Sequence, residues 1–342
     1  MNAAAPASAN LNPDAGRFTA DPWADDAVAK IMGGWALPQP APMNIEDKLE
    51  LAKAVAAQWE DHWARLNEVT TDFSRWTSNA AVQGWTPPQK GMVAPVQSAL
   101  GEYLTASKDM PEWADAKKIA RAEELFMDNG VLSVVLLFCS SLPECYVLPD
   151  LAEVLHTTGQ LEQRTDWRIR STAAMIFPVM MRGGLTTPAG GGVAQVLKVR
   201  LIHAMVRNLV LRGSPQEFAA APLPALAALR ASHDMNHVLF AHGWDAARGL
   251  PCNQAEQAYT LLTFGYVVLR GLRTLGLKLD ARDERAVLHA WNVVGHLGGI
   301  RRELMVFEMD EAEALFARMR SRGRTELQPP DARPALAAAL FG

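Results

Sequence analysis

Hydrophobic and polar positions follow a helical period along most of the chain. Apolar residues recur every three or four positions in segments at about 149–158, 161–182, 193–212, 223–242, 254–276, 280–298 and 308–322, the spacing that gathers them on one face of an α-helix. "IEDKLELAKAVAAQWEDHWARL" after Asn44 and "PEWADAKKIARAEELFMDN" between Pro111 and Gly130 show the same period with residues typical of helix ends. The alternation typical of strands is nearly absent. The pattern therefore predicts an all-α fold.

The two ends of the chain differ from this helical middle. Residues 1–43 are rich in Ala, Pro, Asn and Gly and include the proline cluster "LPQPAP" at 37–42. Such a composition predicts an N-terminal arm that lies over a core or is partly disordered. We expect one all-α domain over residues 44–325, which is long enough to bury a sizeable core, and a C-terminal tail over 326–342.

Composition and charge exclude several classes of protein. The chain is 49% hydrophobic and 20% charged with a net charge of -4, which is typical of a soluble globular protein and gives no basic surface for nucleic acid. The three cysteines form neither a CxxC pair nor a CxxCH haem-attachment motif, as expected in a reducing compartment. The first residues lack a basic, apolar leader or a twin arginine. The longest apolar run, "GVLSVVLLFC", is about half of the roughly 20 residues that cross a bilayer. We expect a cytoplasmic protein without a transmembrane segment; the oligomeric state is not indicated.

Most of the eight histidines have an ordinary structural interpretation. His62, His156, His289 and His296 lie on amphipathic helices, where a histidine usually just satisfies a hydrogen bond. In "SHDMNHVLFAH", His233 and His237 are four apart and can face one metal, as in HExxH. The glutamate of that motif is missing and Asp234 is no equivalent. A metal hydrolase centred on this pair is one alternative. The glycine-rich loop "GGLTTPAGGG" at 183–192 lacks GxGxxG and a Walker lysine, so it is weak evidence for phosphate binding.

The segment "KVRLIHAMVR" carries the strongest candidate chemistry. Arg200 lies three residues before His203 and Arg207 four residues after it, so all three share one helix face with several valines. Two permanent cations in an apolar stripe require an anionic partner. A haem fits this requirement, because its iron takes a neutral imidazole and its two propionates take cations. Helix-face arginines that simply reach solvent are the other interpretation.

Four stretches make the sequence similar to the latex clearing proteins (rubber oxygenases) and the fungal MpaB-type oxygenases, which share one catalytic domain. They are "LPECYVLPDLAEVLHTTGQL" (142–161), "RTDWRIRSTAAMIFPVM" (164–180), "VRLIHAMVR" (199–207), and "PCNQAEQAYTLLTFGYVVLRGLRTLGLKL" (251–279) continuing into "HAWNVVGHLGGI" (289–300). Together they fall within about residues 120–310. The combination of R-x-x-H-x-x-x-R with the downstream blocks is fairly specific, whereas each block alone is weak.

The resemblance implies a globin-like core that holds a non-covalent haem b. His203 matches the family's proximal iron ligand, and Arg200 and Arg207 match the arginines that flank it. Arg168 and Thr172 match a distal arginine and threonine, while Ser171 stands where the latex clearing proteins have a lysine. The family's distal glutamate has two candidates here: Glu153, the nearest by spacing, and Glu144.

The resemblance further implies an activity, the dioxygen-dependent cleavage of a carbon–carbon double bond in a hydrophobic small-molecule or polyisoprenoid substrate. In such an enzyme the haem supplies the oxygen chemistry, and the protein sets the axial ligand and the pocket. Three alternatives stay open at this point. They are a haem-binding protein without turnover (a sensor or an electron carrier), which the loss of the lysine at Ser171 allows, the metal hydrolase of His233 and His237, and a helical bundle without a cofactor.

Overall fold

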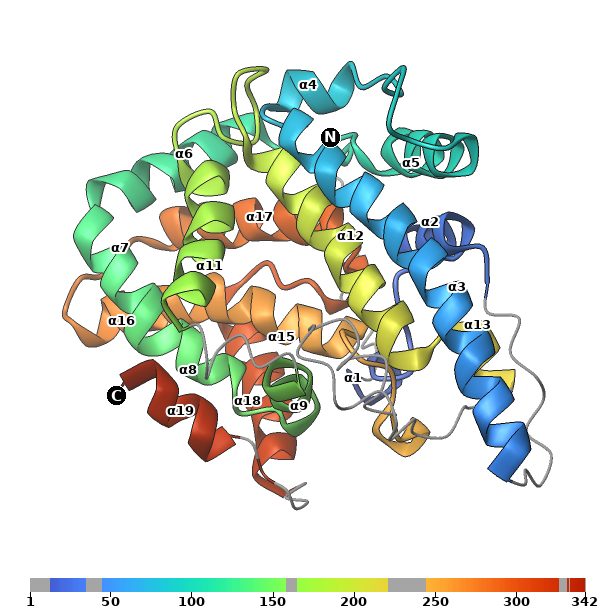
Figure 1. Cartoon of the computed structure of the whole chain (residues 1–342). Helices are drawn as coiled ribbons and strands as arrows, with labels where there is room; N and C mark the ends of the chain where they lie inside the picture. Colours follow the sequence, from blue (N-terminus) through green and yellow to red (C-terminus); the bar gives the residue numbers. More distant parts are fainter. Residues whose placement is uncertain are drawn as a thin grey trace.

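The computed structural model describes residues 13–34, 45–157, 165–220, 244–325, 331 and 333–341, and these residues form helices and loops with no strand among them (Figure 1). The predicted all-α fold is confirmed. The α-helices are α1 (Pro13–Gly16), α2 (Pro22–Met32), α3 (Ile45–Asp72), α4 (Asn79–Gln83), α5 (Ala94–Ser107), α6 (Ala116–Asp128), α7 (Gly130–Leu136), α8 (Leu142–Cys145), α9 (Pro149–Thr157), α11 (Thr165–Met180), α12 (Gly192–Leu211), α13 (Pro215–Ala220), α15 (Gln254–Phe264), α16 (Tyr266–Thr274), α17 (Ala281–Leu297), α18 (Met309–Thr325) and α19 (Arg333–Phe341). A π-helical turn, η2 (Leu137–Ser141), and three short 3₁₀ turns, η1 (Phe73–Arg75), η4 (Ala246–Arg248) and η5 (Arg302–Leu304), complete the described elements.

Two helices begin or end at other residues than their hydrophobic spacing predicts. The segment predicted over 254–276 is broken at Gly265, where a Cβ would lie 3.3 Å from Cδ1 of Trp291 in α17. The helix expected to open at Pro111 begins at Ala116, because the Asp115 carboxylate accepts hydrogen bonds from the backbone N–H groups of residues 117 and 118 and so caps the helix. The segment expected over 223–242 lies outside the described residues.

Helix α12 runs through the middle of the molecule and contacts α2, α11 and α17 (Figure 1). Leu197, Leu201 and Ala204 are fully buried on this helix. Tyr103 of α5 is also buried and donates a hydrogen bond from its hydroxyl to the Leu197 carbonyl at 2.8 Å. The helix that carries the candidate histidine is therefore surrounded by the core on most of its circumference.

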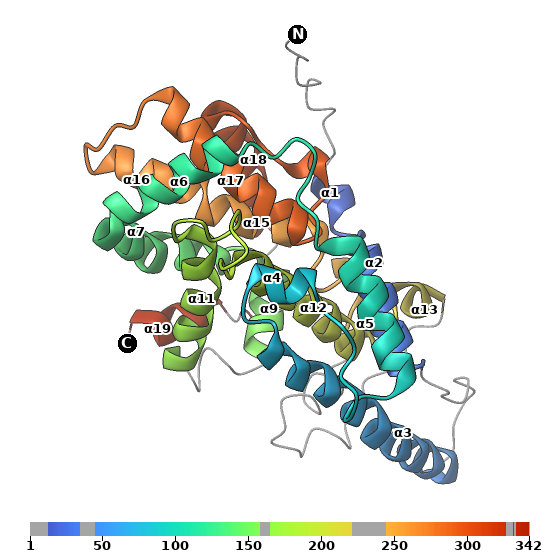
Figure 2. The ribbon, with the colours of Figure 1, turned by 90° about the horizontal axis from the view of Figure 1, so that it is seen from above.

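Residues 13–34 belong to this core, although an arm was expected over 1–43. Helix α2 packs against α5 and α12 (Figure 2), and its Ala24, Val28 and Ile31 are fully buried. The carboxylate of Asp21 caps the first turn of α2 by accepting from the Ala24 N–H. At the other end of the chain, α19 packs on α9 with Leu336 fully buried. The described parts of both ends thus pack against the helical middle, and the domain bounds stay a prediction.

The glycine-rich loop at 183–192 forms a tight turn between α11 and α12. Asn79 of α4 donates from its amide to the carbonyls of Gly184 and Thr187, both at 2.9 Å. The buried carboxylate of Glu123 in α6 accepts from the Gly183 N–H at 2.7 Å, and a Cβ at Gly184 would lie 2.2 Å from the Pro178 carbonyl. The Glu123 carboxylate thus already accepts hydrogen bonds from backbone N–H groups of the kind that would bind a phosphate. From this turn α11 and α12 diverge (Figure 1).

Within the described residues, no single helix is long and apolar enough to cross a membrane. One pair of helical segments passes the same test of length and composition together, Ala116–Asp128 with Gly130–Cys145, but the two are bent by 90° at the break between them. The three cysteines are all free.

Candidate functional site

His203 lies on the one face of α12 that the rest of the described structure covers incompletely. The partly buried or exposed residues of this helix recur every three or four positions; they are Gln195, Lys198, Val199, Ile202, His203 and Val206. Ile202 is 40% exposed although it is a large apolar residue. The remaining positions of the helix are buried. Gln195 and Lys198 lie at one end of this stripe, and around His203 its members are the aliphatic Val199, Ile202 and Val206. An incompletely covered imidazole among aliphatic side chains is typical of a ligand-binding face.

The two arginines point away from this stripe. At about 100° per residue, positions 200 and 207 lie roughly 60° and 40° to one side of His203, whereas Val199 and Val206 lie roughly 40° and 60° to the other side. Both guanidiniums are buried: the side chain of Arg200 is 6% exposed and that of Arg207 is 0% exposed. His203 therefore stands at the boundary between a buried cationic side and an open apolar side of the same helix.

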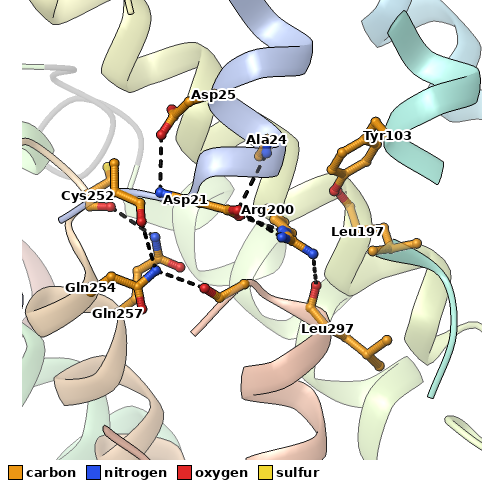
Figure 3. Close-up of polar contacts among 12 residues, drawn as sticks. Asp21, Ala24, Asp25, Tyr103, Leu197, Arg200, Cys252, Gln254, Gln257 and Leu297 are labelled. Carbon is orange, nitrogen blue, oxygen red and sulfur yellow. Dashed lines mark hydrogen bonds and ion pairs between the residues drawn. The ribbon is translucent and has the colours of Figure 1, made fainter. Parts of the chain in front are cut away.

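Arg200 binds the carboxylate that caps α2. Its Nε and Nη2 donate to the two carboxylate oxygens of Asp21, with Nη2–Oδ1 at 2.8 Å, and its Nη1 donates to the Leu297 carbonyl at 3.3 Å (Figure 3). The guanidinium also lies over the Tyr103 ring, 5.8 Å from its centroid. Such a two-pronged contact fixes both position and orientation.

Arg207 makes a similar contact one turn of α2 further on. Its Nε donates to Oδ1 of Asp25 at 2.8 Å, and its Nη1 donates to the Cys252 carbonyl at 2.6 Å. The other carboxylate oxygen of Asp25 accepts from the Asp21 N–H at 3.1 Å (Figure 3). Burial raises the pKa of the Asp25 carboxyl, and the Arg207 charge partly opposes this rise. Nη2 of Arg207 is buried and has no hydrogen-bond partner among the described residues.

Two carboxylates of this chain, Asp21 and Asp25, thus meet the two buried arginines, and the contact of Arg200 and Arg207 with a haem stays a prediction. The sequence pattern did not pair either aspartate with an arginine, because the partners lie 179 and 182 positions apart along the chain. A local signal for Asp21 did exist, since Asp followed by Pro22 is typical of a helix N-terminus.

The expected distal residues lie on α11, which packs beside α12. Ser171 and Thr172 are half-buried there. Arg168 also falls within α11, but its side chain lies outside the described residues. The structure thus places the helix of the expected distal pair next to the helix of His203, and the roles of the individual side chains stay predictions.

The two acids considered for the distal side have partners on other helices. Glu153 forms an ion pair with Arg248 of η4. Glu144 contacts Arg320 of α18 at 3.1 Å and also accepts from the Tyr259 hydroxyl and from Arg270 Nη2, both at 3.3 Å. Among the described contacts of these acids, none comes from α11 or α12, so neither acid is brought to His203 by a contact seen here.

The remaining histidines that the structure describes give no second candidate site. His289 makes the expected structural hydrogen bond, accepting from the Asp115 N–H at 2.9 Å. The cluster of His233, Asp234, His237 and His242 lies outside the described residues. Within the part of the chain that the structure describes, no group of three or more His, Cys, Asp or Glu residues could hold a metal ion.

Comparisons with known proteins agree with this architecture. The family model described as "ER-bound oxygenase mpaB/B'/Rubber oxygenase, catalytic domain" matches residues 147–340. A rubber oxygenase of Streptomyces sp. (strain K30) is 24% identical over 242 residues, covering 69% of this chain and 51% of that protein. The chain therefore spans about half the length of this curated relative. The solved structure of latex clearing protein in the closed state matches with a TM-score of 0.63 and 19% identity, over 97% of this chain and 70% of that one.

Proposed function

This chain belongs to the family of the MpaB-type and rubber oxygenase catalytic domain, and from that premise we propose that it is an oxygenase that uses haem b and dioxygen to cleave a carbon–carbon double bond in a hydrophobic, isoprenoid-like substrate. One observation carries the proposal. His203, the residue that matches the family's proximal ligand, lies on the incompletely covered apolar face of the otherwise buried helix α12.

The residues present on this face fit a haem in their chemistry. A neutral imidazole is the common proximal ligand of haem iron, and the aliphatic side chains of Val199, Ile202 and Val206 offer the apolar contacts that a porphyrin needs. On the cationic side, Arg207 retains one buried donor, Nη2, without a partner. A buried unsatisfied donor is costly, and a carboxylate of the cofactor would satisfy it. Arg200, by contrast, is held by Asp21 and Leu297 through all three of its nitrogens.

In this proposal the protein contributes binding, orientation and polarity. Haem supplies the oxygen chemistry when it is bound. His203 would hold it from α12, and Asp21 and Asp25 would keep that helix in place through Arg200 and Arg207. On α11, the Thr172 hydroxyl and Arg168 would donate hydrogen bonds toward developing negative charge on the substrate side. Ser171 stands where latex clearing proteins have a lysine, and its side chain is too short to reach a haem iron from there. We therefore propose that no protein side chain would bind the iron from the α11 side.

The test is the replacement of His203 by alanine. We expect His203→Ala to lose haem retention, measured by absorbance of the purified protein after haem reconstitution, while the urea midpoint of the apoprotein changes little because the imidazole is only half-buried. His62→Ala is the matched control, since His62 is a buried histidine outside α12, and this variant should keep its haem. Full haem retention in His203→Ala would refute the assignment. Haem retention by the parent protein without oxygen consumption on a polyisoprenoid or a shorter isoprenoid would instead support haem binding without turnover.

A further inference from the structure

The turn that joins α11 to α12 is bound by side chains from two other helices. Asn79 of α4 and Glu123 of α6 both form hydrogen bonds to its backbone, and these residues are only 6% and 1% exposed. Both helices lie beside the end of the molecule at which α11 and α12 are joined (Figure 1). The residues proposed to face a haem, Thr172 and His203, lie on the two helices that diverge from this turn.

Asn79 connects the two helices through a single amide group. Its Oδ1 accepts a hydrogen bond from the Val193 N–H at 3.0 Å, in the first turn of α12. Its Nδ2 donates to the carbonyls of Gly184 and Thr187, both at 2.9 Å, in the turn that follows α11. Because α12 begins after Gly191, which has no side chain to cap a helix, Asn79 supplies that cap from another helix.

Glu123 binds the same turn on the side of α11. Its carboxylate accepts from the Gly183 N–H at 2.7 Å and from the Leu185 N–H at 3.5 Å. The backbone inside the turn is also closely packed, since a Cβ at Gly190 would overlap the Gly183 carbonyl oxygen. The two helices therefore start from a base whose backbone groups are bound on both sides and which has little room to change shape.

We propose that Asn79 and Glu123 are positioning residues of the candidate site, which set the angle between α11 and α12 and so the separation of the residues that face a haem. His203 lies eleven residues after Gly192, which is about 16 Å along the helix. A change of about 10° at the turn would thus move His203 by roughly 3 Å relative to α11. Functional groups must be held to within about 0.5 Å, so such a change would disrupt the site.

This inference rests on the proposed function for the identity of the ligand, whereas the angle is a property of the chain that is measured without haem. A purely structural role is the rival interpretation. In that case, loss of either side chain would lower the free energy of unfolding and leave the folded molecules unchanged. The positioning role is favoured because one amide binds both helices, so the helices cannot part at the turn while its three hydrogen bonds are kept.

The first experiment measures the separation of α11 and α12 in the full chain without haem. Nitroxide labels are attached to Arg170→Cys on α11 and Ile202→Cys on α12, two exposed positions, in a Cys139→Ser background that removes the exposed native cysteine. Pulsed electron paramagnetic resonance gives the distance between the labels. We expect a narrow distribution in the parent protein, and a shift or broadening of about 2–3 Å in Asn79→Ala and in Glu123→Ala.

Asn79→Asp tests the two ends of the amide separately, and it also serves if Asn79→Ala does not fold. It keeps an acceptor for the Val193 N–H but cannot donate to the carbonyls of Gly184 and Thr187. We expect the distance to shift about as much as in Asn79→Ala, while hydrogen exchange at Val193 stays as slow as in the parent protein. In Asn79→Ala, by contrast, exchange at Val193 should rise because its acceptor is lost.

Two more variants complete the comparison. Glu123→Gln keeps an acceptor for the Gly183 N–H and should restore most of the parental distance. Asn292→Ala is the matched control, because Asn292 is 2% exposed and its Nδ2 donates to the Val306 carbonyl at 2.7 Å, outside the turn. This control should lower the urea midpoint and leave the distance between the labels unchanged.

The second experiment measures haem dissociation from the reconstituted unlabelled protein by transfer to excess apomyoglobin. We expect haem to leave Asn79→Ala about tenfold faster than the parent protein, since altered contacts act mostly on the dissociation rate. Haem should leave Asn292→Ala at the parental rate. The comparison separates an effect of the angle on the ligand from a general loss of stability.

Unchanged distances in Asn79→Ala and Glu123→Ala, together with lowered urea midpoints, would overturn the proposal and leave both residues with a structural role. Shifted distances with parental haem dissociation would also overturn it, because the angle would then not matter to the ligand. A parent protein that retains no haem would refute the proposed function instead. The distances would still decide whether Asn79 and Glu123 set the angle between α11 and α12.

Discussion

The ion pair between Arg207 and Asp25 makes a quantitative prediction. Its side chains are 0% and 3% exposed and Nε–Oδ1 is 2.8 Å, so the attraction at an effective dielectric constant of 20 is about 6 kcal/mol. Most of this attraction offsets the loss of hydration of two buried ions. Asp25→Ala removes the attraction but leaves the guanidinium buried against carbonyl oxygens alone. We therefore expect this variant to lower the free energy of unfolding by about 3–5 kcal/mol.

Urea unfolding of the haem-free protein, analysed as a double-mutant cycle, measures this effect. In the cycle, Asp25→Leu with Arg207→Met removes both charges and should destabilise less than Asp25→Ala alone, because no uncompensated ion stays buried. Glu102→Ala is the control. It removes an exposed ion pair of α2, Lys30–Glu102, at 2.7 Å with side chains 48% and 57% exposed, and should cost less than about 1 kcal/mol. If Asp25→Ala costs no more than Glu102→Ala in the haem-free protein, Asp25 is not the main partner of Arg207 and the cofactor propionate regains that role.

Two further predictions concern the supports of the site. His289 accepts a hydrogen bond from the Asp115 N–H, and burial lowers the pKa of its imidazole below the usual 6.5. As the pH falls, this imidazole is therefore protonated in the unfolded chain before it is protonated in the folded protein. The parent protein should therefore lose stability as the pH falls below about 6.5. The urea midpoint of His289→Gln should change less between pH 7 and pH 5 than that of the parent protein. An equal change in both proteins would show that His289 is not the group responsible. Glu123→Ala should cost about 1–3 kcal/mol for each backbone donor left buried at Gly183 and Leu185, whereas Glu123→Gln keeps an acceptor and should cost less. Hydrogen exchange at Gly183 should rise in the alanine variant, and unchanged exchange would show that another group binds the loop.

The sequence was sufficient for features that depend on neighbouring residues. Apolar spacing predicted α3, α9, α11, α12, α17 and α18 to within a few residues, since helices are set by local periodicity and caps. The break at Gly265 was missed because it follows from the approach of Trp291, a tertiary contact. The start of α6 was also misplaced, but for a local reason, because Asp115 and not Pro111 makes the capping contacts.

At the candidate site, the sequence placed His203 on a helix face but could not tell which part of that face is covered. Helical spacing puts Val196, Val199, Val206 and Val210 on one stripe, yet the structure buries Val196 and Val210 and leaves Val199 and Val206 partly exposed. The difference arises from which elements pack on α12, and no local pattern encodes that choice. Glu153 forms an ion pair with Arg248, a tertiary contact that spacing does not indicate, and its distal role stays a prediction.

The pairing of α2 with α12 also bears on the order in which the chain folds. Asp21 and Asp25 leave the ribosome about 180 residues before Arg200 and Arg207, and contacts of such wide sequence separation form late because closing the intervening loop is entropically costly. Until then the two aspartates are hydrated as ordinary anions. The helix of His203 reaches its final packing only after synthesis has passed residue 207, so α2 docks late although it is made before α12.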